Sequence, residues 1–347
     1  MPPASDIRKR SSPQRAAGVF RPAWWLPGAH LQTLWPALLR RPRALALRRE
    51  RFELPDGDFI DVDWAGEQGP MVVVMHGLGG SSASHYARGI LAAFAARGWR
   101  AVLMHFRGCS GEPNRLPRSY HAGDTADLHA FVTALRTREP HTPLMAVGYS
   151  LGGNVLLKWL GEQAQAAPVE AAVAVSVPFD LNDATIRLQQ GFSRLYDRHI
   201  LRGLRAALIQ KAARMPLPWD HKEIAAINSL REFDDRITAP LHGFRNAADY
   251  YARATCRPFL QHIAAPTLVI HAADDPFMSP TVVPGLRELS SATCLELSSH
   301  GGHVGFVAGE PWGPRYWLER RIPEFLAGVV DSVGNLGNAQ SRRAQSL

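Results

Sequence analysis

The amino-acid sequence predicts an α/β fold in which helices flank a central, mostly parallel sheet. Short apolar runs alternate with amphipathic stretches of helical spacing between residues 71 and 180, and the alternation resumes near residue 265. Strands of a parallel sheet are buried on both faces, so they read as continuous apolar runs, and helices usually connect them. With 347 residues, 46% of them hydrophobic and 20% charged, the chain has an ordinary globular composition and length enough for one large domain.

The expected elements begin with a hairpin, in which two strands at 48–54 and 58–65 are joined by the turn signal "PDGD". Six apolar strands follow, at 71–80, 99–108, 142–150, 170–180, 265–277 and 292–303. Helices with apolar residues at helical spacing are expected at 85–98, 124–138 and 151–164. Asp124 is placed to cap the second of these helices at its N-terminus.

The strand–helix alternation stops from about 180 to 260, where the stretch 192–215 is helical and basic. A helical insertion at this place in the chain is expected to form a lid over a site at the carboxyl edge of the sheet. We expect one domain over residues 18–330. The polar segment 1–17 and the tail 331–347, rich in Gly, Asn, Gln, Ser and Arg, are predicted to be disordered.

The net charge of +8 is concentrated at the N-terminus, because residues 1–51 hold eleven Lys/Arg and two Asp/Glu. The rest of the chain carries a net charge of −1, so nucleic-acid binding by the main body has no electrostatic support. Cys109, Cys256 and Cys294 are far apart and form no CxxC pair. This spacing argues against a disulfide framework or a zinc site and favours a reducing, cytoplasmic location. Nothing in the sequence indicates an oligomeric state.

The stretch 22–39, "PAWWLPGAHLQTLWPALL", has no charged residue, but Pro27 and Pro36 interrupt it. It is too short and too broken for a membrane span, so no transmembrane segment is expected. We expect its tryptophans to pack on the core, the commoner use of large aromatic side chains. The alternative is weak peripheral contact with an anionic lipid surface through these residues and "RRPRALALRR" at 40–49.

The stretch "AVGYSLGGN", residues 146–154, places Ser150 where an apolar strand changes into a helix. Gly148 and Gly152 flank it in the pattern G-x-S-x-G, which is typical of a tight turn that exposes a nucleophilic serine at a helix N-terminus. The helix dipole and the free N–H groups there favour developing negative charge. A lone match is a weak signal, since a serine that merely caps the helix would look the same.

A serine nucleophile needs a base and a group that orients the base. His303 follows the last apolar strand, and Asp274 and Asp275 follow the strand before it. Successive residues of an extended chain point in opposite directions, so only one of the two aspartates can face the histidine. The order Ser…Asp…His is that of the α/β-hydrolases.

Oxyanion donors are also available at the expected sheet edge. "HGLGG" at 76–80 ends an early strand, so the backbone N–H of Leu78, with that of Leu151 after the serine, can bind a developing oxyanion.

Three other candidates have simpler explanations. His300 and His303 have no further ligand nearby at zinc spacing, so no metal is expected. His76 is expected to support its loop through hydrogen bonds. Cys109 is expected to be small and buried and not catalytic.

The motifs "WWLPGAHLQTLWP", "HGLGGSS", "HFRGCSGEPNRLPRSYHAGDTADL", "GYSLGGN", "RITAPLHGFRNAADYY" and "APTLVIHAADDPF…SSHGGHVGF" carry a family resemblance. The sequence from about residue 20 to 328 resembles the AB hydrolase 4 family, the YheT-like α/β-hydrolases. The resemblance implies an α/β-hydrolase fold and a triad of Ser150, His303 and, directly before Pro276, Asp275. It also implies hydrolysis of carboxylic esters, of the short-chain carboxylesterase or acylglycerol lipase type, without cofactor or metal. The N-terminal membrane anchor of many animal relatives is not expected here.

Two alternatives to ester hydrolysis remain at this point. An acyltransferase would form the same acyl-enzyme and pass it to an alcohol, although no HxxxxD acyltransferase signature occurs in the sequence. A non-catalytic binding protein of the same fold would typically lack one of the three residues, all of which are present.

Overall fold

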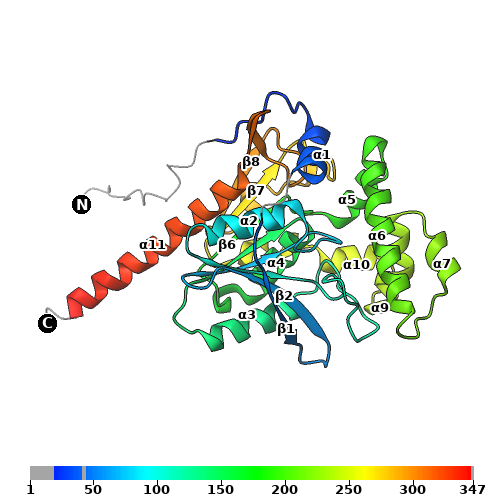
Figure 1. The fold of residues 1–347 in the computed structure, drawn as a ribbon, viewed down its shortest axis with the longest axis horizontal. Coiled ribbons are helices and arrows are strands. Elements are labelled where there is room, and N and C mark those ends of the chain that lie inside the picture. Colours follow the sequence, from blue (N-terminus) through cyan, green and yellow to red (C-terminus); the bar gives the residue numbers. More distant parts are fainter. Residues whose placement is uncertain (1–18, 41–43, 345–347) are drawn as a thin grey trace, which may run out of the picture.

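The computed structural model describes residues 19–40 and 44–344, with side chains described as far as Ser332. At its centre is an eight-stranded sheet in the order β1-β2-β4-β3-β5-β6-β7-β8 (Figure 1). The strands are β1 (Arg48–Glu53), β2 (Phe59–Ala65), β3 (Met71–Met75), β4 (Arg100–Met104), β5 (Leu144–Tyr149), β6 (Ala171–Val175), β7 (Thr267–Ala272) and β8 (Thr293–Ser298). β2 pairs antiparallel with β1 and β4, and all pairings from β4 through β3 to β8 are parallel. The mostly parallel α/β sheet expected from the sequence is thus confirmed.

The apolar run of β3 explains why the sheet is covered on both faces. Val73 and Met75 belong to one core cluster and Val72 and Val74 to another, and all four are buried. Successive side chains of a strand point to opposite faces, so a strand between two helical layers must be apolar throughout. The core therefore consists of two apolar layers with the sheet between them.

The helices that cover the sheet come from its parallel crossovers and from the C-terminus. They are α2 (His85–Ala95), α3 (Ala126–Arg138), α4 (Leu151–Gln163) and α11 (Leu318–Ala344). α3 and α4 share the core cluster that contains Val73, and α2 and α11 share the cluster that contains Val72. A short 3-10 turn, η1 (Ala164–Ala166), follows α4.

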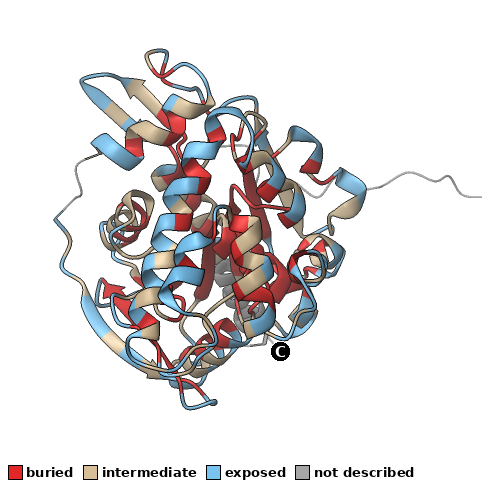
Figure 2. Cartoon of the chain, turned by 90° about the vertical axis from the view of Figure 1, so that its right-hand side faces the viewer, coloured by how far each residue is buried: buried red, intermediate tan, exposed pale blue. Residues whose placement is uncertain are grey.

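The regular elements of the segment between β6 and β7 are all helical, and we call this segment the insertion. It comprises α5 (Leu181–Leu188), η2 (Gly191–Ser193), α6 (Arg194–Ala212), α7 (His221–Ala226), α8 (Leu230–Phe233), η3 (Asp234–Thr238), α9 (Ala239–Leu241), α10 (Ala247–Ala254) and η4 (Arg257–His262). It has a small core of its own, which includes Leu201, Leu208, Ile224 and Ile227. The insertion stands at one side of the sheet in Figure 1, and Figure 2 shows its outer side exposed and the sheet behind it buried.

The N-terminal helix α1 (Ala29–Leu39) lies against a second sheet, the hairpin of β9 (Val307–Glu310) and β10 (Gly313–Tyr316). The side-chain amide of Gln32 donates to the carbonyl oxygen of Val307 at 3.1 Å and accepts from the Val307 N–H at 2.8 Å. Gln32 is 1% exposed, so this pairing satisfies polar groups that would otherwise be buried without partners. Two 3-10 turns, η5 (Pro280–Val282) and η6 (Leu286–Glu288), lie between β7 and β8.

The tryptophans of the N-terminal stretch divide into two kinds. The rings of Trp25 and Trp35 meet edge to face with centroids 4.7 Å apart, and Trp25 Nε1 donates to the carbonyl oxygen of Gly309 at 2.8 Å. Trp24 is 71% exposed and donates from Nε1 to Glu310 Oε2 at 2.8 Å. The expected packing on the core is therefore correct for Trp25 and Trp35 and wrong for Trp24.

The structure differs from the sequence-based expectation at two further places. Asp124 does not cap α3, because its carboxylate accepts from Arg118 at 2.6 Å and the N-cap is Thr125. The tail expected to be disordered over 331–347 is helical as far as Ala344, as the end of α11. Its Ala, Gln and Arg residues favour helix, and extending a helix that packing has already started is far easier than starting one. The segment 1–17, also expected to be disordered, lies outside the described residues, as do 345–347.

The two kinds of tryptophan give a matched pair of substitutions. Trp25→Ala is expected to lower the free energy of unfolding by about 3 kcal/mol, the usual loss for a packed large aromatic side chain. Trp24→Ala should lower it by less than about 1 kcal/mol, as is typical of an exposed side chain. Denaturant titration of both variants measures the difference, and equal losses would contradict this account of the N-terminal stretch.

Candidate active site

Ser150 occupies a sharp turn between β5 and α4. Its backbone has φ 52° and ψ −118°, in the left-handed region that non-glycine residues rarely adopt. A Cβ atom on Gly148 would lie 2.4 Å from the Gly152 carbonyl oxygen, and a Cβ on Gly152 would lie 2.6 Å from the His76 carbonyl oxygen. The spacing G-x-S-x-G is therefore a steric requirement, because the turn closes tightly on itself and against the end of β3.

Three predicted side chains meet at the carboxyl edge of the sheet. Ser150 Oγ lies 3.0 Å from His303 Nε2, and His303 Nδ1 lies 2.9 Å from Asp275 Oδ2. Asp275 is 4% exposed, and its other carboxylate oxygen accepts from the Phe277 N–H at 2.9 Å. The Phe277 ring stacks on the His303 ring with centroids 3.9 Å apart. The imidazole is thus held in one orientation, with one nitrogen toward the carboxylate and the other toward the hydroxyl.

The neighbouring Asp274 points away from this arrangement. Its Oδ1 accepts from the Gly302 N–H at 2.9 Å, and its Oδ2 lies 3.4 Å from His300 Nδ1. Of the two aspartates that the sequence offered, Asp275 is the one that faces His303. His300 stands beside Asp274, and no group of three or more His, Cys, Asp or Glu side chains in the described parts of the chain is placed to hold a metal ion.

The loop after β3 brings the predicted oxyanion donors beside Ser150. The Gly77 N–H donates to Tyr86 Oη at 2.7 Å and the Gly79 N–H donates to Tyr120 Oη at 2.9 Å. The N–H of Leu78, between them, has no acceptor among the described residues. Leu151 begins α4, so its N–H has no acceptor within the helix. Two backbone donors thus remain for an oxyanion, in a loop that two tyrosine hydroxyls hold in place.

Burial keeps the supporting groups of this loop neutral. It lowers the pKa of His76 to about 3, so the ring accepts at Nε2 from the Phe106 N–H and donates at Nδ1 to the Gly77 carbonyl oxygen. Burial raises the pKa of the Tyr86 and Tyr120 hydroxyls. It also raises the pKa of Cys109 to about 12, which leaves a thiol and not a nucleophilic thiolate at neutral pH.

The His303 loop is held by contacts that the sequence analysis did not assign. The His303 N–H donates to Thr33 Oγ1 at 2.9 Å, and Thr33 Oγ1 donates to the Ala29 carbonyl oxygen at 2.7 Å. The Val304 N–H donates to Ser176 Oγ at 3.1 Å. A Cβ on Gly302, whose φ is +60°, would lie 2.5 Å from the Ala29 carbonyl oxygen, so only glycine lets α1 approach this closely. The only sequence feature that pointed to this role of Thr33 was the motif "HLQT", which contains it.

A cavity of about 440 Å³ opens above Ser150. Leu78, Leu151 and His303 line it next to the serine, together with apolar side chains of α1 and the insertion, among them Leu34, Leu38, Leu181, Leu188, Phe192 and Leu195. His85 also lines it, and burial lowers its pKa to about 4. The cavity thus joins a polar floor at the carboxyl edge of the sheet to apolar walls.

A second cavity of about 300 Å³ shares Leu78, Leu151, Asp234 and Tyr250 with the first. Its wall includes Lys211 of α6, whose ammonium group donates to Asn114 Oδ1 at 2.8 Å and to the Arg118 carbonyl oxygen at 2.6 Å. Burial lowers the pKa of Lys211 to about 8. The ammonium group ties the insertion to the loop that follows β4.

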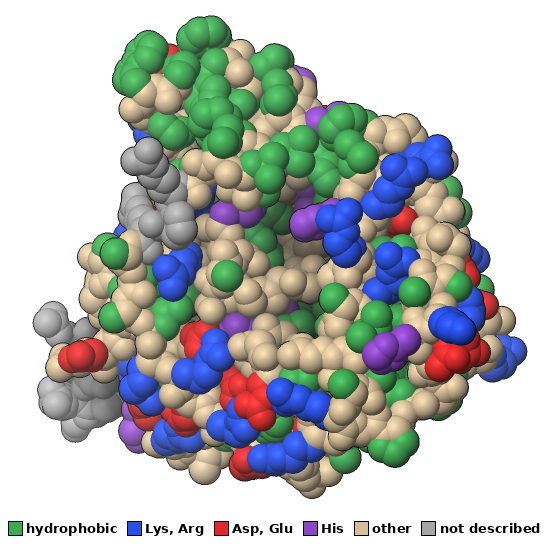
Figure 3. All heavy atoms as spheres, turned by 45° about the vertical axis from the view of Figure 1, so that its right-hand side comes forward, with side chains coloured by type: hydrophobic (Ala, Val, Ile, Leu, Met, Phe, Trp, Pro, Cys, Tyr) green, Lys and Arg blue, Asp and Glu red, His purple; other side chains and the backbone are tan. Residues whose placement is uncertain are grey.

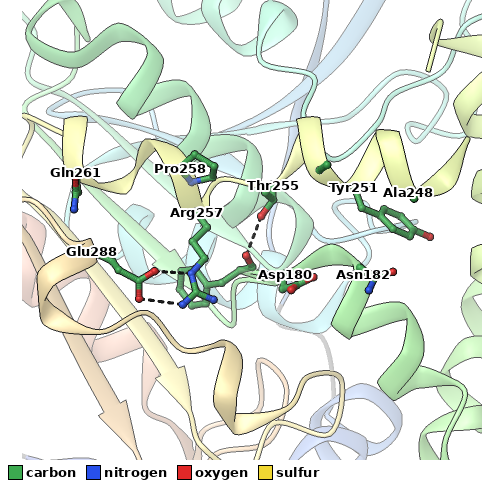
Figure 4. Close-up of a pocket in the computed structure, with 11 residues that line it drawn as sticks. Asp180, Asn182, Ala248, Tyr251, Thr255, Arg257, Pro258, Gln261 and Glu288 are labelled. Carbon is green, nitrogen blue, oxygen red and sulfur yellow. Dashed lines mark hydrogen bonds and ion pairs between the residues drawn. The ribbon is translucent and has the colours of Figure 1, made fainter. Parts of the chain in front are cut away.

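A third cavity, of about 610 Å³, is lined by none of the predicted site residues (Figure 4). In it, Arg257 and Glu288 point toward one another and form two hydrogen bonds, at 2.6 and 3.0 Å. Thr255 Oγ1 donates to the Phe179 carbonyl oxygen at 2.8 Å. Arg257 and Glu288 already satisfy each other, and Asp180 caps α5 by accepting from the Asp183 N–H, so the size of this cavity does not make it the reactive site.

Thr33 gives a test of how the His303 loop is positioned. Thr33→Val keeps the side-chain shape but removes the acceptor of the His303 N–H, a loss of about 1 kcal/mol that should misplace the imidazole. We expect a fluorophosphonate to label Ser150 several-fold more slowly in this variant, measured as the rate of label incorporation. Thr33→Ser keeps the oxygen and should react like the wild type, and Ser150→Ala should stay unlabelled. An unchanged rate in Thr33→Val would exclude the positioning role.

Comparison with known proteins places the fold and the sequence in one family. A family model described as "alpha/beta hydrolase fold" matches residues 70–310. The Escherichia coli (strain K12) protein "Putative esterase YheT" is 45% identical over 324 residues, which cover 91% of this chain and 95% of that protein. The mouse (Mus musculus) protein named phospholipase ABHD3 is 28% identical over 334 residues, 92% of this chain and 81% of its own. The Saccharomyces cerevisiae monoacylglycerol lipase is 29% identical over 294 residues, 82% of this chain and 64% of its own.

Solved structures share the fold at low sequence identity. The Pyrococcus furiosus esterase Pf2001 has a TM-score of 0.53 at 16% identity and covers 82% of this chain and 91% of its own. The α/β hydrolase GrgF of Penicillium has a TM-score of 0.54 at 19% identity and covers 81% of this chain and 98% of its own. The family model and the 45% identical relative show more than the fold. The chain belongs to the alpha/beta hydrolase fold family, as its motifs indicated.

Proposed function

We propose that the protein is a serine hydrolase of carboxylic esters, of the short-chain carboxylesterase or acylglycerol lipase type. The observation that supports it most is the hydrogen-bonded chain from Ser150 Oγ through both nitrogens of His303 to Asp275 Oδ2, at 3.0 and 2.9 Å. In this family the relatives named above are an esterase, a phospholipase and a monoacylglycerol lipase. Their names share ester hydrolysis, the reaction that such a chain of side chains can perform.

In the proposed mechanism, His303 Nε2 takes the proton of Ser150 while Oγ attacks the ester carbonyl carbon. The N–H groups of Leu78 and Leu151 bind the oxyanion of the tetrahedral intermediate. His303 then gives the proton to the leaving alcohol, and an acyl-enzyme forms on Ser150. Water attacks the acyl group by the same route, with His303 as base, and frees the acid. Asp275 holds the imidazole in the required tautomer and stabilises its charged form, so no step uses a metal or a cofactor.

The substrate class follows from the walls of the cavity. Its lining from α1 and the insertion is mainly aliphatic and aromatic, which suits an apolar acyl chain better than a charged or strongly polar group. The insertion, which supplies Leu181, Leu188 and Phe192 to this wall, is the proposed lid. A lipid-like ester is therefore the proposed substrate, and a cytoplasmic location is part of the same proposal.

No helix in the part of the chain that the structure describes is long and apolar enough to span a membrane.

A panel of p-nitrophenyl esters from acetate to palmitate tests the reaction directly. The wild type is expected to turn over short and medium chains, and Ser150→Ala should lose on the order of 10⁴-fold or more in kcat because the nucleophile is gone. Ser332→Ala, on the exposed part of α11, serves as the control and should match the wild type. Adding an acceptor alcohol separates hydrolysis from acyl transfer, since a transferase would form the new ester. A Ser150→Ala variant with a tenth of wild-type turnover would overturn the mechanism.

The two adjacent aspartates offer a second, matched test. Asp275→Asn should leave His303 in the wrong tautomer and reduce kcat on the order of 10⁴-fold, as in other hydrolases with such a triad. Asp274→Asn keeps an oxygen for the Gly302 N–H, so we expect nearly full activity and a stability loss of at most about 1 kcal/mol. The measurements are kcat and the melting temperature of both variants. An inactive Asp274→Asn beside an active Asp275→Asn would show that the orienting acid has been assigned to the wrong residue.

A further inference from the structure

Several large apolar side chains are exposed on the N-terminal stretch, α1, the β9–β10 turn and the start of the insertion, and we call this area the mouth surface. It consists of Trp24, Leu31, Leu38, Leu39, Phe192, Leu195 and Trp312. Trp312, Leu38 and Trp24 are 83%, 73% and 71% exposed, values that are unusual for side chains of this size. Single exposed apolar residues are common on soluble proteins, but a contiguous group marks an interaction surface.

Contacts between the elements show that the mouth surface is contiguous. Trp24 bonds to Glu310 of β9, and the β9–β10 turn carries Trp312. The Gln32 amide joins α1 to β9 at Val307, so the exposed leucines of α1 stand next to the hairpin.

The contact continues from α1 to the insertion. The His30 ring lies with its centroid 4.4 Å from that of Phe192, and His30 Nδ1 lies 3.1 Å from Tyr196 Oη. Figure 3 shows hydrophobic side chains gathered on this face, beside a hollow and bordered by Lys and Arg.

The mouth surface is continuous with the site. Leu38, Phe192 and Leu195 are exposed to solvent and also line the cavity that contains Ser150 and His303. An apolar chain that leaves a lipid phase at this surface would therefore enter the cavity without crossing water. A surface that only stabilised the fold would have no reason to open into the reactive site.

Four arginines beside the mouth surface have no carboxylate partner among the described residues, and the mouth surface itself holds an exposed carboxylate, Glu310, which accepts from Trp24. Arg187 of α5 and Arg194, Arg198 and Arg202 of α6 form no ion pair with any carboxylate in the described ranges. The three on α6 are spaced four residues apart, so they share one stripe of the helix next to Leu195. Many of the other described arginines are paired, as Arg136 is with Glu170 at 2.8 Å. This row of unpaired cations complements an anionic surface.

We propose that the mouth surface docks on an anionic lipid bilayer, with the tryptophans and leucines in the interface and the four arginines over the headgroups. Interfacial tryptophan, apolar leucine and clustered arginine are the combination that binds such a surface. A second copy of the chain fits less well, because a symmetric contact would bring four unpaired arginines from each copy against a mouth surface that offers Glu310 as a carboxylate, so most of the arginines would stay unmatched. The proposal rests on the proposed function, since it assigns the lipid phase as the source of the ester.

Co-sedimentation with vesicles of phosphatidylcholine alone, or mixed with phosphatidylglycerol, tests the docking. We expect the wild type to pellet with the anionic vesicles at least tenfold more strongly than with the neutral ones, and high salt should weaken this. Leu39→Glu combined with Trp312→Glu should reduce binding at least tenfold, since both side chains are exposed and neither lines the cavity. Arg198→Glu combined with Arg202→Glu should remove the preference for anionic vesicles.

The matched control is Leu286→Glu, because Leu286 is 83% exposed but lies beside the third cavity, two residues from Glu288. It should bind vesicles like the wild type. Ser150→Ala should also bind like the wild type, which separates docking from catalysis: a chain that binds vesicles but hydrolyses no ester contradicts the proposed function alone. The docking proposal is overturned if the wild type hydrolyses soluble esters but does not pellet with anionic vesicles. It is also overturned if the Leu39→Glu/Trp312→Glu variant changes only the size of the protein in gel filtration.

Discussion

The close approach of the β5–α4 turn to the end of β3 is the constraint on which the site depends. A Cβ on Gly152 would lie 2.6 Å from the His76 carbonyl oxygen, and a Cβ on Gly77 would lie 3.3 Å from Ser150 Cβ. The turn can close only with glycine at 148 and 152, and closing it brings the serine next to the loop that carries Leu78. The Ser150 N–H donates to the Val175 carbonyl oxygen of β6 at 2.8 Å, which fixes the turn across the sheet. One steric requirement thus places the proposed nucleophile and both proposed oxyanion donors together.

The other half of the site depends on a segment far away in the sequence. His303 comes from the loop after β8, but Thr33 of α1 accepts from its N–H, and Gly302 lets α1 lie against the loop. Gln32 fixes the same helix to Val307. The family model begins at residue 70, so α1 lies outside the matched region and yet holds the proposed base. The N-terminal stretch is therefore part of the site's architecture and at the same time supplies the exposed leucines of the mouth surface.

How much of the fold and of the site can be predicted from the sequence depends on how far apart in the chain the interacting residues lie. The parallel strands are predictable because a run such as Met71–Met75 must be apolar on both faces. The turn at Ser150 is predictable because G-x-S-x-G is a local steric requirement. The choice between Asp274 and Asp275 could not be made from spacing alone, because neighbouring residues differ only in the direction they face. The hydroxyls of Tyr86, Tyr120 and Thr33 act on backbone groups 9, 41 and 270 residues away, and no periodicity encodes such pairs. Asp124 was mistaken for a cap because its ion pair with Arg118, six residues earlier in the chain, overrides the preference of aspartate for the cap position.

The insertion is fixed to the body at both ends of α6. At its start the buried Ser193 Oγ donates to the Pro276 carbonyl oxygen at 2.7 Å, and at its end Lys211 bonds to the loop after β4. Lys211 is 3% exposed and donates to Asn114, which in turn donates to Asp58 at 2.5 Å, and Asp58 accepts from Arg107 at 3.0 Å. A buried ionic network of this kind adds little net stability, because the desolvation of each charge offsets the attraction between the charges. Its contribution is to specificity, since its hydrogen bonds form in only one relative position of α6 and the loop. The other end of α6 begins beside Phe192 and meets α1 through aromatic contacts of His30 and Tyr196. The Lys211 network thus fixes the wall of the second cavity, while a hydrogen bond from Ser193 and the aromatic contacts with α1 hold the start of α6 beside the apolar cavity.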